Sequence, residues 1–251
     1  MTNTANPPHL HPGFRCEVVH VGNERLPVIV IDNFLREAAR LVEFAQTRSE
    51  FRPLEGTLYP GVRAPMPQAY GLAINEYLRE TICAVFGLGT AKIVSEHCDF
   101  ALVTTPPEDL LSVQRCPHFD GTGISFIAGV HYLCAPEHGG TSFYRHRRTG
   151  FESIGEARRT IYAAALENDF ATFGVPPAQY ANGDSDLFER TASFDAVFNR
   201  LLLYRGVILH SGNIAPGFRL DGNPRTGRLT ANSFLQFGQN PDVTSAKEGT
   251  T

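Results

Sequence analysis

The stretch LLLYRGVILHSG, residues 201–212, decides the fold class of this chain. It is a run of apolar residues, many of them branched, that is broken by a glycine and ends in the polar sequence His-Ser-Gly. Such a run is typical of a strand, or a pair of strands, followed by a turn. Similar runs recur through the second half of the chain, at residues 91–105, 123–135, 139–147 and 227–238. Many short strands punctuated by glycine and proline favour a mainly β domain of the barrel or sandwich type.

Helices are expected beside these strands, chiefly in the first third of the chain. Residues 26–34, LPVIVIDNF, have the β-branched composition of a buried strand that ends in a turn. Apolar residues at helical spacing predict one helix within residues 35–51 and a second over residues 69–87, with a loop rich in proline and glycine at 52–67. Residues 152–191 interrupt the strands, and we expect a helix followed by a loop there. The expected fold class is therefore mainly β with flanking helices (α+β).

The length of 251 residues suits one large domain or two small ones. We expect a single domain over residues 16–238, with an N-terminal strand and helices at 26–88 and a strand-rich core at about 92–238. Residues 1–15 hold several prolines and histidines and little apolar content, so they are expected to form a flexible arm. The polar residues 239–251 are expected to form a flexible tail.

Composition narrows the classes of partner. The net charge is −4 and no run of five or six like charges occurs, so neither a nucleic-acid partner nor a membrane partner is expected. The five cysteines have no C-x-x-C spacing, which favours a reducing compartment over a disulfide framework. With no recognisable signal peptide and no apolar run long enough to span a bilayer, we expect a cytoplasmic protein. The oligomeric state is left open by the sequence.

The segment CPHFDGTG, residues 116–123, places a histidine and a carboxylate two residues apart. In an extended segment residues i and i+2 project to the same face, so His118 and Asp120 are able to aim at one point. His210 ends a later apolar strand and supplies a third ligand. Two histidines and one carboxylate leave coordination positions open on a metal, as in non-haem Fe(II) oxygenases.

A second H-x-D occurs at His97 and Asp99, so this motif alone is a weak signal. A single histidine of this kind is more often an ordinary turn residue than a metal ligand. The copy at His97 lies inside a strand-like run rather than at a strand edge before glycine. We therefore favour His118 and Asp120.

Oxygen activation at such a site usually needs an electron donor, commonly 2-oxoglutarate. Its distal carboxylate favours a bidentate arginine partner. Arg228 stands at the head of an apolar strand, and Thr230 lies two residues on, on the same face. Arg219 and Arg225 are rivals, but both lie in a turn-like stretch that we expect to be exposed.

These segments resemble the Fe(II)/2-oxoglutarate-dependent oxygenases, in particular the prolyl-hydroxylase-like members. The resemblance covers about residues 95–238 and is carried by HFD, by YLCAPEHGGTSF, by LLLYRGVILHSG and by GRLTANSFLQF. More narrowly, the chain resembles a bacterial group of unknown function that is related to these oxygenases. The family implies a double-stranded β-helix, that is, a jelly-roll or cupin-like barrel.

The same resemblance implies a set of roles for individual residues. His118, Asp120 and His210 would be the catalytic ligands of Fe(II), and O2 would be a co-substrate. Arg228, assisted by Thr230, would anchor 2-oxoglutarate. Tyr132 is a further candidate for a hydrogen bond to that co-substrate.

The expected reaction is hydroxylation of an unactivated C–H bond. The sequence does not distinguish a small metabolite, an amino acid or a peptidyl side chain as the substrate, so the expected partner is a small molecule or a peptide. Two alternatives stay open. One is a non-catalytic jelly-roll protein that binds a ligand and carries a structural metal. The other is a Zn- or Mn-dependent hydrolase or isomerase that uses the same three ligands.

Overall fold

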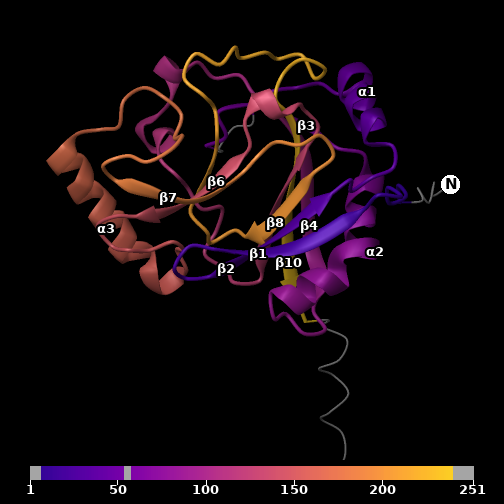
Figure 1. Ribbon diagram of the computed structural model, residues 1–251, viewed down its shortest axis with the longest axis horizontal. Helices are drawn as coiled ribbons and strands as arrows, with labels where there is room; N and C mark the ends of the chain where they lie inside the picture. Colours follow the sequence, from indigo (N-terminus) through magenta and orange to yellow (C-terminus); the bar gives the residue numbers. More distant parts are fainter. Residues whose placement is uncertain (1–6, 54–57, 240–251) are drawn as a thin grey trace, which may run out of the picture.

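The computed structural model describes residues 7–53 and 58–239. Within them the strands form two antiparallel sheets (Figure 1). The major sheet has the order β1 (Arg15–Val21), β2 (Leu26–Asp32), β8 (Leu201–Arg205), β5 (Phe126–Tyr132), β10 (Leu229–Gly238), β4 (Lys92–Val103), β3 (Gly61–Pro65). The minor sheet has the order β7 (Phe188–Phe194), β6 (Thr141–His146), β9 (His210–Gly212).

Three helices flank the sheets. Figure 1 shows α1 (Ala38–Arg48) and α2 (Gln68–Val85) at the side of the major sheet, whereas α3 (Glu156–Phe173) lies at the opposite end of the molecule, beyond β6 and β7. Three short 3₁₀ turns connect the strands: η1 (Pro107–Asp109), η2 (Ser112–Arg115) and η3 (Pro136–His138). The structure thus confirms a mainly β protein with flanking helices.

Strand β10 shows how the major sheet separates two cores. Successive side chains of a strand point to opposite faces. Leu229, Ala231 and Leu235 belong to the core formed with α1 and α2, whereas Phe234 packs into the core between the two sheets. Thr230 shares the face of Phe234, four residues along the strand. Thr230 of the major sheet therefore faces the minor sheet, where the candidate site lies.

The expected barrel is not found as a closed structure. Within the described residues the hydrogen-bonded ladders form two separate sheets, and none of them closes the sheets into one barrel. An isolated bridge pairs His210 of β9 in the minor sheet with His118, which lies in a loop outside both sheets.

Two edge strands lie where the sequence predicts a loop or a helix, and a third, β1, lies where it predicts no element. β3 lies within residues 52–67, where a loop is predicted, and β7 begins within residues 152–191, where a helix and a loop are predicted. β3 and β7 are only partly buried, and neither GVRAP nor FERTASF shows the regular apolar alternation that identifies a strand. They form because β4 and β6 offer free edges for pairing. The helices of residues 35–51, 69–87 and 152–174 are confirmed.

The expected arm is described from residue 7 onward. Leu10 forms a β-bridge with Leu35, and the backbone N–H of His11 donates to the carbonyl of Phe34 at 3.2 Å. Arg15 already belongs to β1. Residues 1–6 of the arm and residues 240–251 of the tail lie outside the described residues.

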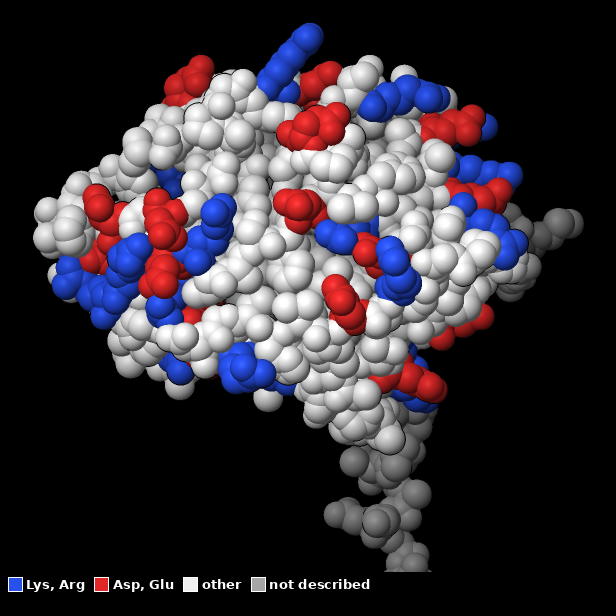
Figure 2. All heavy atoms as spheres, in the orientation of Figure 1, with Lys and Arg blue, Asp and Glu red and all other residues white. Residues whose placement is uncertain are grey.

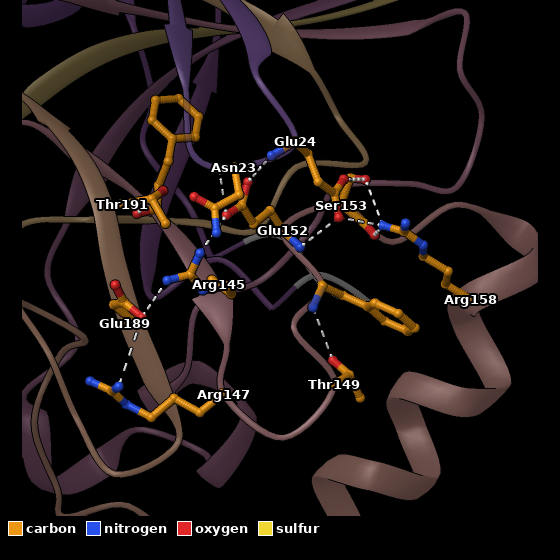
Figure 3. Close-up of polar contacts among 12 residues, drawn as sticks. Asn23, Glu24, Arg145, Arg147, Thr149, Glu152, Ser153, Arg158, Glu189 and Thr191 are labelled. Atoms are coloured by element: carbon orange, nitrogen blue, oxygen red, sulfur yellow. Dashed lines mark hydrogen bonds and ion pairs between the residues drawn. The ribbon is translucent and has the colours of Figure 1, made fainter.

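The turn between β1 and β2 is tied to the minor sheet by Glu152 (Figure 3). This carboxylate is buried and accepts hydrogen bonds from the backbone N–H groups of Asn23 and Glu24, both at 2.9 Å. Arg145 of β6 donates to the same carboxylate at 3.3 Å. Gly22 has φ +66°, and a Cβ there would lie 2.0 Å from the Glu152 Oε2, so glycine is required for this approach.

The face shown in Figure 2 carries acidic and basic side chains that are interspersed rather than gathered by sign. None of the helices in the described part of the chain is both long and apolar enough to cross a membrane.

Candidate metal centre

Three side chains that the sequence singles out converge at one point. The donor atoms of His118, Asp120 and His210 all lie within 4.8 Å of one another. The His118 Nε2 is 3.7 Å from one carboxylate oxygen of Asp120, and the His210 Nε2 is 3.5 Å from the other. These separations are too long for hydrogen bonds, so the three groups face a shared space rather than one another.

Backbone hydrogen bonds hold this cluster in place. His118 and His210 form a bridge in which each N–H donates to the other's carbonyl. The N–H of Asp120 donates to the carbonyl of Gly206 at 2.7 Å. A Cβ on Gly206 would meet the ring of Phe126 at 2.5 Å, so a side chain at this position would disturb the turn that holds Asp120.

The protonation of His210 suits metal binding. Its Nδ1 lies 2.8 Å from the carbonyl oxygen of Ile208, which accepts only, so the proton must be on Nδ1 and the lone pair on Nε2. Burial lowers the pKa of His210 to about 4, although the Ile208 carbonyl partly opposes this shift. The neutral imidazole, the form that binds metals, is therefore favoured near neutral pH.

The cluster fits a divalent transition-metal ion. Ligating histidines typically donate their other N–H to a carbonyl or carboxylate, as His210 does here. Nitrogen and oxygen ligands lie about 2.0–2.2 Å from such an ion, and the three donor atoms, all within 4.8 Å of one another, face one shared space. Burial raises the pKa of the Asp120 carboxyl, while the charges of His118 and Arg63 lower it. A bound cation would stabilise the carboxylate further.

The cluster lies in a cavity of about 410 Å³. Its walls come from both sheets and from segments around Tyr59, Val113 and Tyr180. A cavity of this size is in the range used for small-molecule sites. His118 is the most accessible of the three candidate ligands, since 53 % of its side chain is exposed.

Arg228 lines the same cavity and is held by three backbone carbonyls. Its Nε donates to the carbonyls of His138 and Gly139, both at 3.1 Å, and its Nη2 donates to Gly140 at 2.9 Å. The Nη1 group takes part in none of these three bonds, and 5 % of the residue is exposed. The guanidinium is therefore oriented by the backbone while part of it remains available to a ligand in the cavity.

The double glycine of the segment YLCAPEHGGTSF makes this cradle possible. A Cβ on Gly139 would lie 1.8 Å from the carbonyl oxygen of Asn213, and one on Gly140 would lie 1.7 Å from that of Phe194. Gly139 also has φ +74°, a conformation that favours glycine. Larger residues would push the turn, and its carbonyls, away from Arg228.

The remaining predicted residues have different positions. Thr230 lines the cavity, and its hydroxyl donates to the side-chain oxygen of Asn232 at 2.9 Å. Tyr132 is not among the lining residues; its hydroxyl donates to Thr141 at 2.6 Å, and its ring centroid is 5.9 Å from the Arg228 Cζ. Arg219 and Arg225, the rivals of Arg228, are exposed and do not line the cavity.

The second H-x-D has another arrangement. His97 and Asp99 lie within β4, and the Nε2 of His97 is 2.6 Å from Asp99 Oδ2. The described residues offer only the cluster of His118, Asp120 and His210 as a group of three metal-binding side chains. The preference for His118 and Asp120 over the earlier copy therefore agrees with the geometry.

Many residues that line the cavity were not found by sequence reasoning, among them Tyr59, Arg63 and Asn232. Tyr59 and Arg63 lie in the stretch expected to be a loop, where no pattern marked them. Asn232 follows Thr230 by two residues in the same strand, so the alternation of β10 was a signal that could have found it.

Together, the two facing sheets and the His-Asp-His cluster define a mainly antiparallel β protein with a candidate metal centre in the cavity between the sheets. The chain belongs to a family of unknown function, DUF6445, whose model matches residues 12–235. A search of curated proteins finds no sequence match.

Several solved structures resemble the chain at low sequence identity. HygX from Streptomyces hygroscopicus, solved with nickel, 2-oxoglutarate and hygromycin B, is 10 % identical, with 85 % of this chain and 84 % of HygX covered and a TM-score of 0.49. SnoK, a non-heme alpha-ketoglutarate-dependent carbocyclase from nogalamycin biosynthesis, is 14 % identical, with 89 % and 85 % covered and a TM-score of 0.47. AviO1 from Streptomyces viridochromogenes Tue57 is 11 % identical, with 91 % and 90 % covered and a TM-score of 0.42.

Proposed function

We propose that this protein is an Fe(II)- and 2-oxoglutarate-dependent dioxygenase that hydroxylates an unactivated C–H bond of a small metabolite, an amino acid or a peptidyl side chain. One observation carries the proposal: the His-Asp-His cluster and the buried Arg228 line the same cavity. The cluster is the donor set of non-haem Fe(II) oxygenases. The arginine is the preferred partner of a carboxylate. In this proposal the two facing sheets are an open jelly roll.

The overall reaction would convert 2-oxoglutarate, O2 and R–H to succinate, CO2 and R–OH. Bound Fe(II) would supply the oxygen-activating chemistry, for which the oxidative decarboxylation of 2-oxoglutarate provides two electrons. His118, Asp120 and His210 would be the protein ligands of the metal, and coordination positions would remain free for other ligands. Their backbone bonds mean that little rearrangement is needed on binding.

Arg228 would bind the carboxylate of 2-oxoglutarate that is remote from the metal. Its orientation is set in advance by the carbonyls of residues 138–140, so little side-chain entropy is lost on binding. Thr230 would offer its hydroxyl from the next position on the same face of β10. Burial of the pair would exclude water and strengthen the charge-assisted hydrogen bonds.

The test is succinate formation by the full chain with Fe(II), 2-oxoglutarate and O2, measured beside anaerobic binding of 2-oxoglutarate to the Fe(II)-loaded protein by visible absorption. The wild-type protein is expected to show both. His210→Ala is expected to lose both, because a ligand is removed, whereas His97→Ala, in the second H-x-D, is expected to keep them. Equal succinate formation in wild type and His210→Ala would exclude this assignment.

A further inference from the structure

A second arginine lines the cavity, on the edge strand β3. Arg63 pairs with Ala101 of β4, and Ala101 pairs in turn with Thr230 of β10. Directly paired residues project to the same face of a sheet, so these side chains form one row. Only 12 % of the Arg63 side chain is exposed. The cavity is therefore lined by two largely buried arginines, Arg63 from the edge of the sheet and Arg228 from the residue just before the interior strand β10.

The guanidinium of Arg63 lies over two aromatic rings. Its Cζ is 4.6 Å from the ring centroid of Tyr59 and 5.5 Å from that of Phe234. Aromatic faces attract a cation and restrict the plane of the guanidinium, whose N–H edge then meets a ligand. The side chain is thus ordered in advance, which lowers the entropic cost of binding.

Hydrogen bonding around Arg63 is incomplete. Its Nη1 lies 3.9 Å from Asp99 Oδ2, beyond hydrogen-bonding distance, and that oxygen is already 2.6 Å from His97. Within the described residues, the Arg63 Nε and the Tyr59 hydroxyl are buried without a hydrogen-bond partner. Buried polar groups left without partners are costly, so two such donors beside one cavity indicate a missing acceptor.

The Tyr59 hydroxyl is suited to donate. Burial raises its pKa to about 12, although the nearby Arg228 and Arg63 partly oppose the shift. The hydroxyl therefore keeps its proton at neutral pH. A guanidinium edge and a phenol on one wall form a donor pair that matches the oxygens of an anion.

The rest of the wall is suited to an apolar group. Leu58, Val113, Phe119 and Ile214 line the cavity, and Leu58 and Val113 are also exposed to solvent. Exposed apolar residues that lead into a cavity indicate where an apolar part of a ligand is covered.

We propose that Arg63 and Tyr59 bind an anionic group of the substrate, a carboxylate or a phosphate, whose apolar remainder lies against this wall. Arg228 is held by the carbonyls of residues 138–140 and serves the co-substrate, so the two cations bind two different anions. This inference rests on the proposed function, because it takes the molecule bound beside the metal centre to be the one oxidised.

The test compares three six-carbon probes of similar apolar content on the full chain by ligand-observed NMR titration: hexanoate, hexyl phosphate and the neutral hexanamide. Wild type is expected to bind one of the anions at least about tenfold more tightly than hexanamide, since charge-assisted hydrogen bonds form with the anion alone. The stronger anion identifies the group. Arg63→Gln is expected to lose the preference, and Arg63→Lys, which keeps the charge without the planar edge, to retain part of it.

Arg52→Gln is the matched control, because Arg52 pairs with Arg63 through the backbone but its side chain is exposed. Arg52→Gln and Arg228→Gln are both expected to keep the preference for the anionic probe over hexanamide. Equal binding of anions and hexanamide by wild type, or an unchanged preference in Arg63→Gln, would overturn the inference. Displacement of the anionic probe by 2-oxoglutarate would also overturn it, because the probe would then lie at Arg228.

These outcomes are separate from those of the proposed function. Absence of succinate formation together with an intact, Arg63-dependent anion preference would reject the oxygenase and keep the anion site. Succinate formation without the anion preference would support the oxygenase and reject the anion site.

Discussion

His118 and His210 exchange both of their backbone hydrogen bonds, at 2.9 and 2.8 Å, across a bridge that belongs to neither sheet ladder. Their ring centroids are 4.4 Å apart. Two residues 92 positions apart in the sequence, 118 and 210, are thus fixed relative to each other by main-chain atoms. Their nitrogen atoms are placed before any ion binds, and Asp120 completes the cluster from the same turn.

Asp120→Asn is expected to weaken metal binding. Ni(II) should stabilise the wild-type protein. An ion that binds the folded but not the unfolded chain raises the free energy of unfolding by about 2.7 kcal/mol when its concentration is a hundred times its dissociation constant. Loss of the carboxylate charge should reduce the affinity for Ni(II) at least roughly 10–100-fold, the loss that is typical when a residue that hydrogen-bonds to a metal ligand is replaced. The measurement is the shift in melting temperature with added Ni(II). Asp109→Asn, an exposed carboxylate, is the control; a full shift in Asp120→Asn would contradict the assignment.

Arg228→Gln is expected to weaken binding of 2-oxoglutarate by about 100-fold, since one charge-assisted interaction contributes about 1.5–3 kcal/mol. Calorimetric titration of the Ni(II)-loaded protein measures this. The exposed Arg225→Gln makes the same chemical change nearby and should bind as wild type does. If both variants bound equally well, the co-substrate carboxylate would have to lie elsewhere.

The buried His131 is expected to make stability fall in mild acid. It is 0 % exposed, and burial lowers its pKa to about 4, while the hydrogen bond with Asn199 opposes the shift. Between pH 6.5 and 4 the unfolded chain takes up a proton that the folded chain excludes. The free energy of unfolding should therefore decrease by about 2–3 kcal/mol from pH 7 to pH 4.5 on account of this residue.

Urea unfolding at several pH values tests this expectation. His131→Gln should show a smaller decrease than wild type over that interval, whatever its stability at pH 7. Parallel curves for the two proteins would mean that His131 takes up its proton equally in both states.

Gly22→Ala is expected to destabilise the fold more than Gly89→Ala. Both glycines have positive φ, +66° and +60°, so both substitutions incur the cost of a left-handed conformation, about 1–2 kcal/mol. A Cβ at residue 22 would also displace the Glu152 carboxylate, whereas nothing lies within 4 Å at residue 89. The lost hydrogen bonds to a buried charge should add about 1.5–3 kcal/mol. Denaturant unfolding of both variants measures the difference, and equal losses would show that the clash relaxes without cost.

The three residues of the candidate metal centre are easier to find in the sequence than the cavity around them. His210 ends a clearly apolar run, and proline and glycine flank His118 and Asp120, so these residues stood out by local pattern although the structure places His118 and Asp120 in the loop before β5. Arg228 and Thr230 followed from the alternation of β10. Each of these signals is local, even though the contacts that join the residues are not.

Arg63 and Tyr59 gave no comparable signal. β3 follows Pro60 and ends at Pro65, and it exists because β4 offers it an edge, so its identity as a strand depends on a partner that is distant in sequence. The same holds for β7 beside β6. The alternation of apolar and polar residues along a strand also does not predict whether two sheets close into a barrel, because closure depends on hydrogen-bonded pairing between their edge strands.

Glu152 receives its partners from both layers of the molecule: two turn amides from the β1–β2 hairpin and an arginine from β6. If the β1–β2 hairpin or β6 came apart, the Glu152 carboxylate would lose two or one of these three partners, which is strongly unfavourable for a buried charge. Neither layer is then able to persist as a partly folded intermediate. The chain should unfold cooperatively, in a single transition that secondary structure and tyrosine fluorescence report at the same denaturant concentration.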